Sequence, residues 1–105
     1  MSPEQDLDSS ARMISEIRAS YIGSILLAKD TPGWRKMADC RGMDPRIFFP
    51  VKDSDSDQGL AICADCRVWV DCLKFAIKNH ELNGIWGGCT EDQRRTGTKR
   101  STRIR

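Results

Sequence analysis

The chain has few of the residues from which a conventional hydrophobic core is built. Aromatic residues make up 7% of its 105 residues, and no apolar run approaches the length of a membrane span. A chain of this length forms at most one small domain, and such domains usually need a disulfide, a metal or a partner for stability. The composition therefore directs attention to the residues that could hold such a stabilising group.

The sequence also lacks the charged start and apolar run of a secretory signal. This absence predicts a cytoplasmic protein without membrane association. In that compartment, clustered thiols bind metals or perform redox chemistry more often than they form structural disulfides. The cysteines number five, and an odd number would leave one thiol unpaired in a disulfide framework.

Three of the cysteines lie within ten residues of one another. Cys63 and Cys66 form a CxxC pair, and Cys72 follows six residues later. Thiolates are good ligands for soft and borderline metals, and both sulfurs of a CxxC pair can reach one metal centre. If a helix begins after the pair, Cys72 returns to the face of Cys66 in under two turns. Cys40 must then arrive from elsewhere in the fold.

Spacing alone leaves the chemistry of this centre open. Zinc suits four thiolates as well as an iron–sulfur cluster does, although zinc ribbons usually bring two CxxC pairs and this chain has one. A CxxC pair can also serve a thiol–disulfide oxidoreductase, but such enzymes place it in a βαβ pattern, which the sequence does not show. A zinc-binding structural adaptor and an oxidoreductase therefore remain as alternatives.

Hydrophobic periodicity predicts helices on both sides of the cysteines. Residues 1–8 are polar and are expected to be disordered, and a helix is expected from about Ser10 to Ala28. Its apolar face would comprise Met13, Ile14, Ile17, Tyr21, Ile22, Ile25 and Leu26. Such a helix either packs on the protein's own core or serves as a hydrophobic arm for a partner or a second copy.

The second half contains the principal helix and two local signals. One helical region is expected from Leu60 to Asn79, with Lys74 and Lys78 facing water. Asp44-Pro45 is typical of a helix start, and of the adjacent Phe48 and Phe49 one could be buried and the other exposed. Thr90-Glu91-Asp92-Gln93 fits a capping box that starts a final helix, which Gly97 and Thr98 should weaken.

Charge is distributed unevenly along the chain. From Gln93 to Arg105 there are six basic residues and no acid, which leaves 11 basic and 15 acidic residues, a net of −4, for residues 1–92. An acidic body with a basic tail is the asymmetry expected of a protein that contacts nucleic acid. A merely solvated tail is the alternative interpretation.

Several of these features occur together, in the order in which one protein family has them. Residues 34 to 100 resemble the WhiB-like family of iron–sulfur transcription factors. The resemblance rests on Trp34 before Cys40, Asp44-Pro45 with Phe48-Phe49-Pro50, the spacing of Cys63, Cys66 and Cys72, the turn Gly84-Ile85-Trp86-Gly87-Gly88, and Thr90-Glu91-Asp92-Gln93-Arg94-Arg95. It divides the chain into an N-terminal extension (1–33), a cluster-binding domain (34–90) and a capped helix start with a basic tail (91–105).

The resemblance carries expectations about fold, cofactor and partners. It implies a small all-α domain wrapped around a 4Fe–4S cluster ligated by Cys40, Cys63, Cys66 and Cys72. It also implies docking to region four of the primary sigma factor, for which the candidate residues are Trp34, Phe48, Phe49, Gly84, Trp86, Gly87 and Gly88. The expected contacts to promoter DNA come from Arg94, Arg95, Lys99, Arg100, Arg103 and Arg105. The expected function is regulatory, with no catalytic residue and no small-molecule substrate, and the candidate signals are redox state and nitric oxide. Cys89 and the long N-terminal extension depart from the family pattern.

Overall fold

The computed structural model describes residues 3–51, 56–81 and 83–103, with side chains for residues 10–51, 56–81 and 83–100. Within these ranges the elements are α1 (Pro3–Ser20), α2 (Ile22–Ile25), η1 (Trp34–Met37), η2 (Pro45–Phe48), α3 (Asp57–Ala64), α4 (Trp69–Lys78) and α5 (Glu91–Arg103), where η1 and η2 are 3-10 helices. The β pairing among the described residues is one isolated bridge between Trp86 and Cys89. The prediction of an all-α fold is confirmed. No described helix combines the length and the apolar character needed to cross a membrane.

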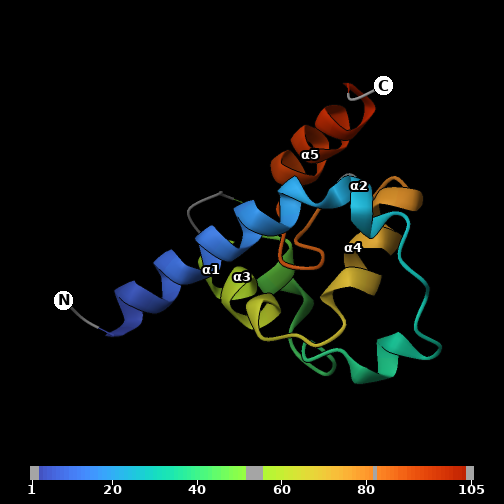
Figure 1. Cartoon of the computed structure of the whole chain (residues 1–105). Helices are drawn as coiled ribbons and strands as arrows, with labels where there is room; N and C mark the ends of the chain where they lie inside the picture. The colour runs from blue at the N-terminus through green and yellow to red at the C-terminus, as the bar shows by residue number, and fades with distance from the viewer. Residues whose placement is uncertain (1–2, 52–55, 82, 104–105) are drawn as a thin grey trace.

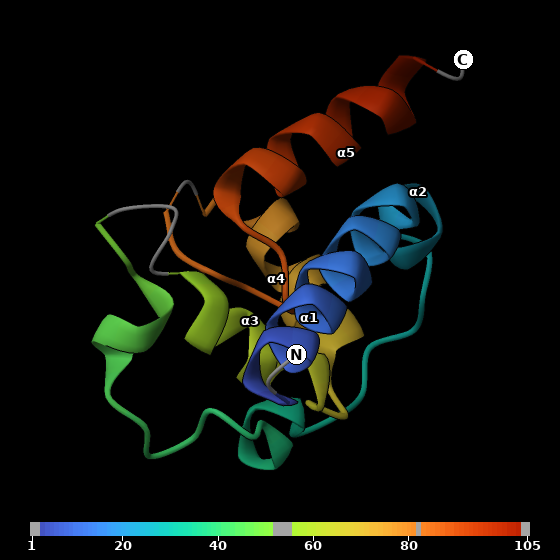
Figure 2. The same cartoon turned by 90° about the vertical axis from the view of Figure 1, so that its left-hand side faces the viewer.

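Helix α1 runs across the molecule and connects its two sides. Helix α1 packs against α3, and nearer the C-terminal end of α1 it contacts α5 (Figure 1). Figure 2, which looks along α1 from its N-terminus, shows α5 lying above it and α4 behind it. The N-terminal extension is therefore packed on the rest of the chain, as the first of the two interpretations of this helix expects.

The predicted apolar face is buried only in part, and the predicted helix is divided at Tyr21. Ile22 and Ile25 of α2 are buried as predicted, whereas Met13, Ile17 and Tyr21 are more than half exposed. Ser15 and Arg18 of α1 are buried instead. The two polar side chains are accommodated because each finds hydrogen-bond partners inside the protein. The helix also begins at Pro3 rather than near Ser10, so the expected disorder of residues 1–8 is wrong for residues 3–8.

The cysteine-rich region forms two helices rather than one. Helix α3 ends at Ala64, and α4 begins at Trp69, so that Cys66 lies in the connection between them. The Arg18 guanidinium donates hydrogen bonds to the carbonyl oxygens of Cys63 and Ala64 at 2.9 Å each. These carbonyls belong to the last turn of α3 and have no partner within the helix. Arg18 therefore caps α3 and stabilises its end at this point.

Helix α4 supplies the centre of one apolar cluster. Leu73 packs with Ile22 and Ile25 of α2 and with Cys89. Lys74 is buried rather than solvated, which corrects the prediction for it, whereas Lys78 is exposed as expected. The Lys74 ammonium donates to Asp30 Oδ1 at 2.8 Å and also to the carbonyl of Ala28. Two hydrogen bonds therefore allow a lysine to be buried here and attach residues 28–30 to α4.

The helix start at Asp44-Pro45 forms as the sequence predicts. Asp44 accepts a hydrogen bond from the backbone N–H of Arg46, and Pro45 occupies the first position of η2. Phe48 at the end of η2 is buried, and the adjacent Phe49 is half exposed. A second apolar cluster forms where Phe48 meets Ala11, Leu60, Cys63 and Ile85.

Helix α5 starts at the predicted capping box and extends further than expected. Gln93 N–H donates to Thr90 Oγ1 at 3.3 Å, and Thr90 N–H donates to Gln93 Oε1 at 2.8 Å. The helix continues through Gly97 to Arg103. A Cβ atom at Gly97 would lie 2.4 Å from Cδ1 of Ile22, so this glycine permits α5 to approach α2 closely. Tertiary packing thus compensates for its low helix propensity.

Candidate metal centre

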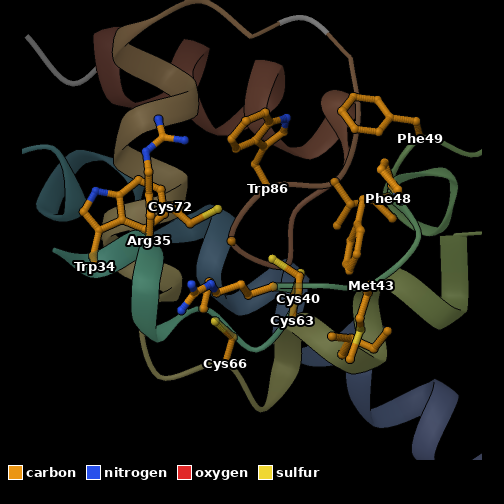
Figure 3. Close-up of a pocket in the computed structure, with 16 residues that line it drawn as sticks. Trp34, Arg35, Cys40, Met43, Phe48, Phe49, Cys63, Cys66, Cys72 and Trp86 are labelled. Atoms are coloured by element: carbon orange, nitrogen blue, oxygen red, sulfur yellow. The ribbon is translucent and has the colours of Figure 1, made fainter.

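The structure brings four of the five cysteines to one cavity. Cys63 is at the end of α3, Cys66 lies in the connection after it, and Cys72 is in the first half of α4. Cys40 comes from the loop that follows η1. All four line a cavity of about 320 Å³, and they occupy the middle of the view in Figure 3. The four predicted ligands therefore converge although they come from separate elements.

Burial and mutual repulsion control the protonation of these thiols. Burial, followed by the charge of Cys72, raises the pKa of Cys63 from 9.0 to about 12. Burial likewise raises the pKa of Cys72 to about 12, and the pKa of Cys40 is raised by burial and then by Cys66. Thiols with such pKa values are neutral near pH 7. A metal group that binds them must displace their protons, which makes binding favourable only if the metal–sulfur bonds are strong.

The turn at residues 84–88 supplies hydrogen-bond donors to two of the sulfurs. The backbone N–H of Gly88 donates toward Cys63 and that of Gly87 toward Cys72, and each hydrogen bond lowers the pKa of its thiol. The turn is closed by reciprocal backbone hydrogen bonds between Trp86 and Cys89, at 3.0 and 3.1 Å. Donors of this kind orient metal ligands and, in iron–sulfur proteins, adjust the reduction potential.

Glycine is required in this turn for both conformation and space. Gly87 and Gly88 have φ angles of 59° and 79°, in the left-handed region. A Cβ atom at Gly87 would lie 2.6 Å from Leu73 Cβ, and one at Gly88 would lie 2.6 Å from Arg18 Nη1. Only a glycine pair therefore lets this backbone approach the cysteines and α4 so closely.

The donor set and the cavity fit a multinuclear cluster. Among the residues that the structure describes, no three Cys, His, Asp or Glu side chains are grouped as ligands of a single metal ion. A zinc ion would draw its four sulfurs to about 2.3 Å from one point. Four thiols that line a cavity of about 320 Å³ also leave room for a cluster, in which the cysteines would bind different iron atoms. Cys40, Cys63, Cys66 and Cys72 would hold it, and the cluster would supply electron-transfer or ligand-sensing chemistry.

Cys89 lies apart from these four cysteines. It is fully buried among Ile22, Ile25 and Leu73, and its thiol is 3.5 Å from the carbonyl oxygen of Ser15. It does not line the cavity. Burial raises its pKa to about 11, although Arg18 and Arg94 act in the opposite direction. Its surroundings are those of a core residue, in agreement with its place outside the four-cysteine pattern.

Aromatic side chains border the cavity. Trp34, Phe48 and Trp86 stand around the cysteines in Figure 3, and all three line the cavity. Phe75 lies between the two indoles, with ring centroids 6.0 Å from Trp34 and 5.7 Å from Trp86. The half-exposed Phe49 lies over Gly84, whose missing side chain makes room for its ring. Of the predicted partner-binding residues, Trp34, Phe48, Phe49, Trp86 and Gly87 thus line the cavity, whereas Gly84 and Gly88 do not.

The six basic residues predicted to contact DNA divide into two groups. Arg94 is buried, and its guanidinium donates to the carbonyl oxygens of Gly84, Cys89 and Glu81 at 2.7–3.1 Å. Its placement with the exposed basic residues is therefore corrected: these carbonyls bind its donors and hold it inside. Arg95, Lys99 and Arg100 are exposed on α5. The side chain of Arg103 and the whole of Arg105 lie outside the described residues.

Sequence reasoning missed three residues of this site. Arg18 contacts the ligand-bearing backbone from outside the recognised motifs, and Arg35 places its guanidinium 4.4 Å from the centroid of Phe75. Phe75 itself is the centre of the aromatic row. Its position three residues after Cys72 is a usable signal, because residues three apart share a helix face. No local pattern distinguishes Arg18 from other helix arginines.

Comparison with known proteins agrees with this arrangement. Residues 34–96 match the family described as "Transcription factor WhiB". The chain is 38% identical over 78 residues to the transcriptional regulator WhiB1 of Mycobacterium tuberculosis, covering 69% of this chain and 92% of that protein. It is 39% identical over 77 residues to WhiB1 of Bifidobacterium longum, covering 69% and 84%, and 40% identical over 68 residues to WhiB of Streptomyces coelicolor, covering 65% and 78%. With four cysteines around one cavity and a family match over more than half of its length, the chain belongs to the WhiB family.

Proposed function

We propose that the protein is a cytoplasmic transcriptional regulator that binds a 4Fe–4S cluster through Cys40, Cys63, Cys66 and Cys72. The observation that carries this proposal is the convergence of four thiols from separate elements on a single cavity. Membership of the WhiB family supports it, as do the names of the relatives, which are transcriptional regulators. Redox state and nitric oxide are the candidate signals, because oxidants, reductants and nitric oxide all react with thiolate-bound iron–sulfur clusters.

The cluster is tested by preparing the protein anaerobically and measuring visible absorption, iron and acid-labile sulfide. Changing any one of the four ligands to Ala should abolish stable cluster binding. Cys89→Ala is the matched control, since it also removes a buried thiol but does not touch the cavity. Colourless protein with stoichiometric zinc would instead support the structural adaptor. Metal-free protein with thiol–disulfide exchange activity would support the oxidoreductase.

The aromatic side of the cavity is proposed to bind region four of the primary sigma factor. Tryptophan is prominent among the residues that dominate binding energy at protein interfaces. Trp86 is partly exposed, and its indole N–H donates to the carbonyl of Asn83 at 3.0 Å, which fixes the ring on its own turn. Phe49 and Trp34 extend the apolar surface around it. Such a rigid surface loses little entropy when a partner docks.

The effect of Trp86→Ala on sigma binding tests this surface. The substitution should weaken binding by at least about 2 kcal/mol while the cluster spectrum is unchanged. Tyr21→Ala is a suitable control, because this aromatic residue, between α1 and α2, is 57% exposed and does not line the cavity. Calorimetric titration with isolated region four provides the measurement. Equal affinities of the wild type and Trp86→Ala would exclude this surface as the docking site.

The exposed basic residues of α5 and the tail are proposed to bind promoter DNA. Arg95, Lys99 and Arg100 are exposed on α5, and Arg103 and Arg105 follow in sequence. Basic residues of this kind mostly contact phosphates, which supply affinity but little sequence information. The sigma factor would therefore recognise the promoter sequence, and binding of this protein to DNA alone should be weak.

Salt dependence tests the DNA contacts. Five phosphate contacts would give a log–log slope of about −4.5, at about −0.9 per contact. Deleting residues 99–105 should make the slope shallower and weaken the ternary complex without reducing binding to sigma. The measurement is a fluorescence anisotropy titration of promoter DNA at several salt concentrations. A complex whose affinity does not change with salt, or with the deletion, would show that the tail is only solvated.

A further inference from the structure

The N-terminal helix α1 precedes the segment that matches the family, yet it contacts the cluster site. The match begins at residue 34, and α1 ends at Ser20. Along α1, the strongest contact to the site is made by Arg18, which is 7% exposed. This buried arginine is not used by the sigma-binding or DNA-binding surfaces proposed above.

The Arg18 guanidinium joins the two segments that surround Cys63. Its Nη1 donates to the carbonyl oxygen of Cys63 at 2.9 Å and to that of Gly87 at 3.1 Å, and its Nη2 donates to the carbonyl oxygen of Ala64 at 2.9 Å. Its planar face lies over Trp69, with Cζ 4.3 Å from the ring centroid. One side chain therefore fixes the end of α3, the glycine turn and the start of α4.

Both segments held by Arg18 carry groups that a cluster would use. The end of α3 carries the Cys63 ligand, and the glycine turn carries the N–H groups that donate toward Cys63 and Cys72. A planar guanidinium with several donors in fixed directions can hold two backbone segments at a set separation, whereas a lysine ammonium cannot. The spacing between the Cys63 carbonyl and the glycine turn therefore depends on Arg18.

The charge of Arg18 acts on the same site. Its guanidinium lies within electrostatic range of Cys63 and Cys66, and burial is the main influence that lowers its pKa. A buried cation is unfavourable unless negative charge lies nearby. A cluster with four thiolates carries net negative charge, which becomes larger when the cluster is reduced. A cation at this position therefore favours the bound cluster and favours its reduced state over its oxidised state.

We propose that Arg18 is a positioning residue of the cluster site and that α1 is an integral part of the cluster-binding unit. Arg18 holds the Cys63 ligand and the glycine turn in place, slows the loss of the cluster and raises its reduction potential. This inference rests on the proposed iron–sulfur function. It assigns to the N-terminal extension a role that differs from that of an arm for a partner.

The test compares three variants of the full-length protein. Arg18→Gln removes both the charge and the planar set of guanidinium N–H donors. Arg18→Lys keeps the charge but loses that set of donors. Arg12→Gln is the matched control: it removes the same charge from the same helix, where Arg12 bonds to Asp57 at 2.6 Å and is 40% exposed. The readouts are the rate of cluster loss in air, the midpoint potential by anaerobic titration, and hydrogen exchange of the metal-free protein.

Arg18→Gln should lose its cluster about tenfold faster or more, the range seen when a partner that orients metal ligands is removed. Its midpoint potential should shift to a more negative value. Arg18→Lys should lose the cluster faster but keep a potential near that of the wild type, because its charge remains. In the metal-free protein, faster exchange should be confined to residues 61–67 and 84–88.

Several outcomes would overturn the inference. If Arg18→Gln matches Arg12→Gln in cluster lifetime and potential, Arg18 is not a positioning residue. If Arg18→Gln does not fold, Arg18→Lys decides: exchange that is faster throughout the chain shows a general stability role, and faster exchange confined to the two segments supports the proposal. Wild-type protein that holds no iron–sulfur cluster refutes the proposed function itself, which distinguishes the two failures.

Discussion

Arg94 and Arg95 are adjacent in sequence, but the structure predicts opposite consequences of their substitution. Arg94 is 4% exposed, whereas Arg95 extends from α5 and pairs with Asp92 on the surface. Sequence alone assigns both residues to the same DNA-binding tail. Replacing each in turn by Met, which keeps an unbranched side chain but removes every donor, separates the two roles.

The magnitude for Arg94 follows from the groups left without partners. Its guanidinium donates to three carbonyl oxygens at 2.7, 2.9 and 3.1 Å, and to that of Asn83 at 3.4 Å. A buried polar group left unsatisfied costs about 1–3 kcal/mol. Water can reach the partly buried acceptors, so we expect a total loss of about 3–5 kcal/mol from the carbonyl oxygens left without a donor. For a protein of this size the loss corresponds to a melting temperature lowered by about 12 °C or more.

Thermal unfolding of the anaerobic protein, followed by circular dichroism, measures this difference. Arg94→Met should show the large decrease, and Arg95→Met should change the free energy of unfolding by no more than about 0.5 kcal/mol. In DNA titrations, Arg95→Met should reduce the salt slope by about 0.9, the value for one phosphate contact. If Arg94→Met has the melting temperature of the wild type and weakens DNA binding as Arg95→Met does, the buried placement of Arg94 is wrong.

Three further predictions concern stability. In the metal-free protein, burial raises the pKa of Cys63 and Cys72 from 9.0 to about 12, so the folded state retains protons that the unfolded state loses. The free energy of unfolding, measured with urea, should therefore fall as pH rises from about 9 toward 12. The expected decrease is up to about 1.4 kcal/mol per pH unit for each thiol. Gly97→Val should cost about 1–3 kcal/mol in the same assay, because its side chain would meet α2 at the closest approach of α5. Lys74→Met should cost about 1–3 kcal/mol by leaving the Ala28 carbonyl without its donor, whereas the exposed Lys78→Met should be neutral.

Features that depend on a few neighbouring residues could be predicted from the sequence. The Asp44-Pro45 helix start and the Thr90–Gln93 capping box form as expected, because each is specified by a side chain and a backbone N–H two or three residues away. The separation of Phe48 and Phe49 into a buried and an exposed ring has the same origin, since adjacent side chains point in different directions. Local chemistry is enough to decide such cases.

Features that depend on distant partners could not be predicted. Apolar periodicity placed Met13, Ile17 and Tyr21 on the inner face of the expected first helix, but all three are exposed. Arg18 of α1 is buried instead, because it finds three carbonyl acceptors more than 40 residues away along the chain. Lys74 is buried for the same reason, since its acceptors lie in the 28–30 segment. A polar side chain that is satisfied only in the tertiary structure leaves no periodic signal in the sequence.

The two buried arginines indicate why this fold should depend on its cluster. Arg18 lies near Cys63 and Cys66, and Arg94 lies near Cys72, so two cations are buried beside the proposed ligands. In the metal-free protein the thiols of Cys63 and Cys72 are neutral at pH 7, and the guanidinium groups are balanced by carbonyl dipoles and by the carboxylates of Asp65, Glu81 and Glu91. Four thiolates on a cluster would supply further negative charge and connect α3, α4 and the Cys40 loop covalently through the metal. Loss of the cluster would therefore remove a link between helices and a source of charge balance at the same time, which is the physical basis on which cluster chemistry could alter the adjoining surface that we propose to bind the sigma factor.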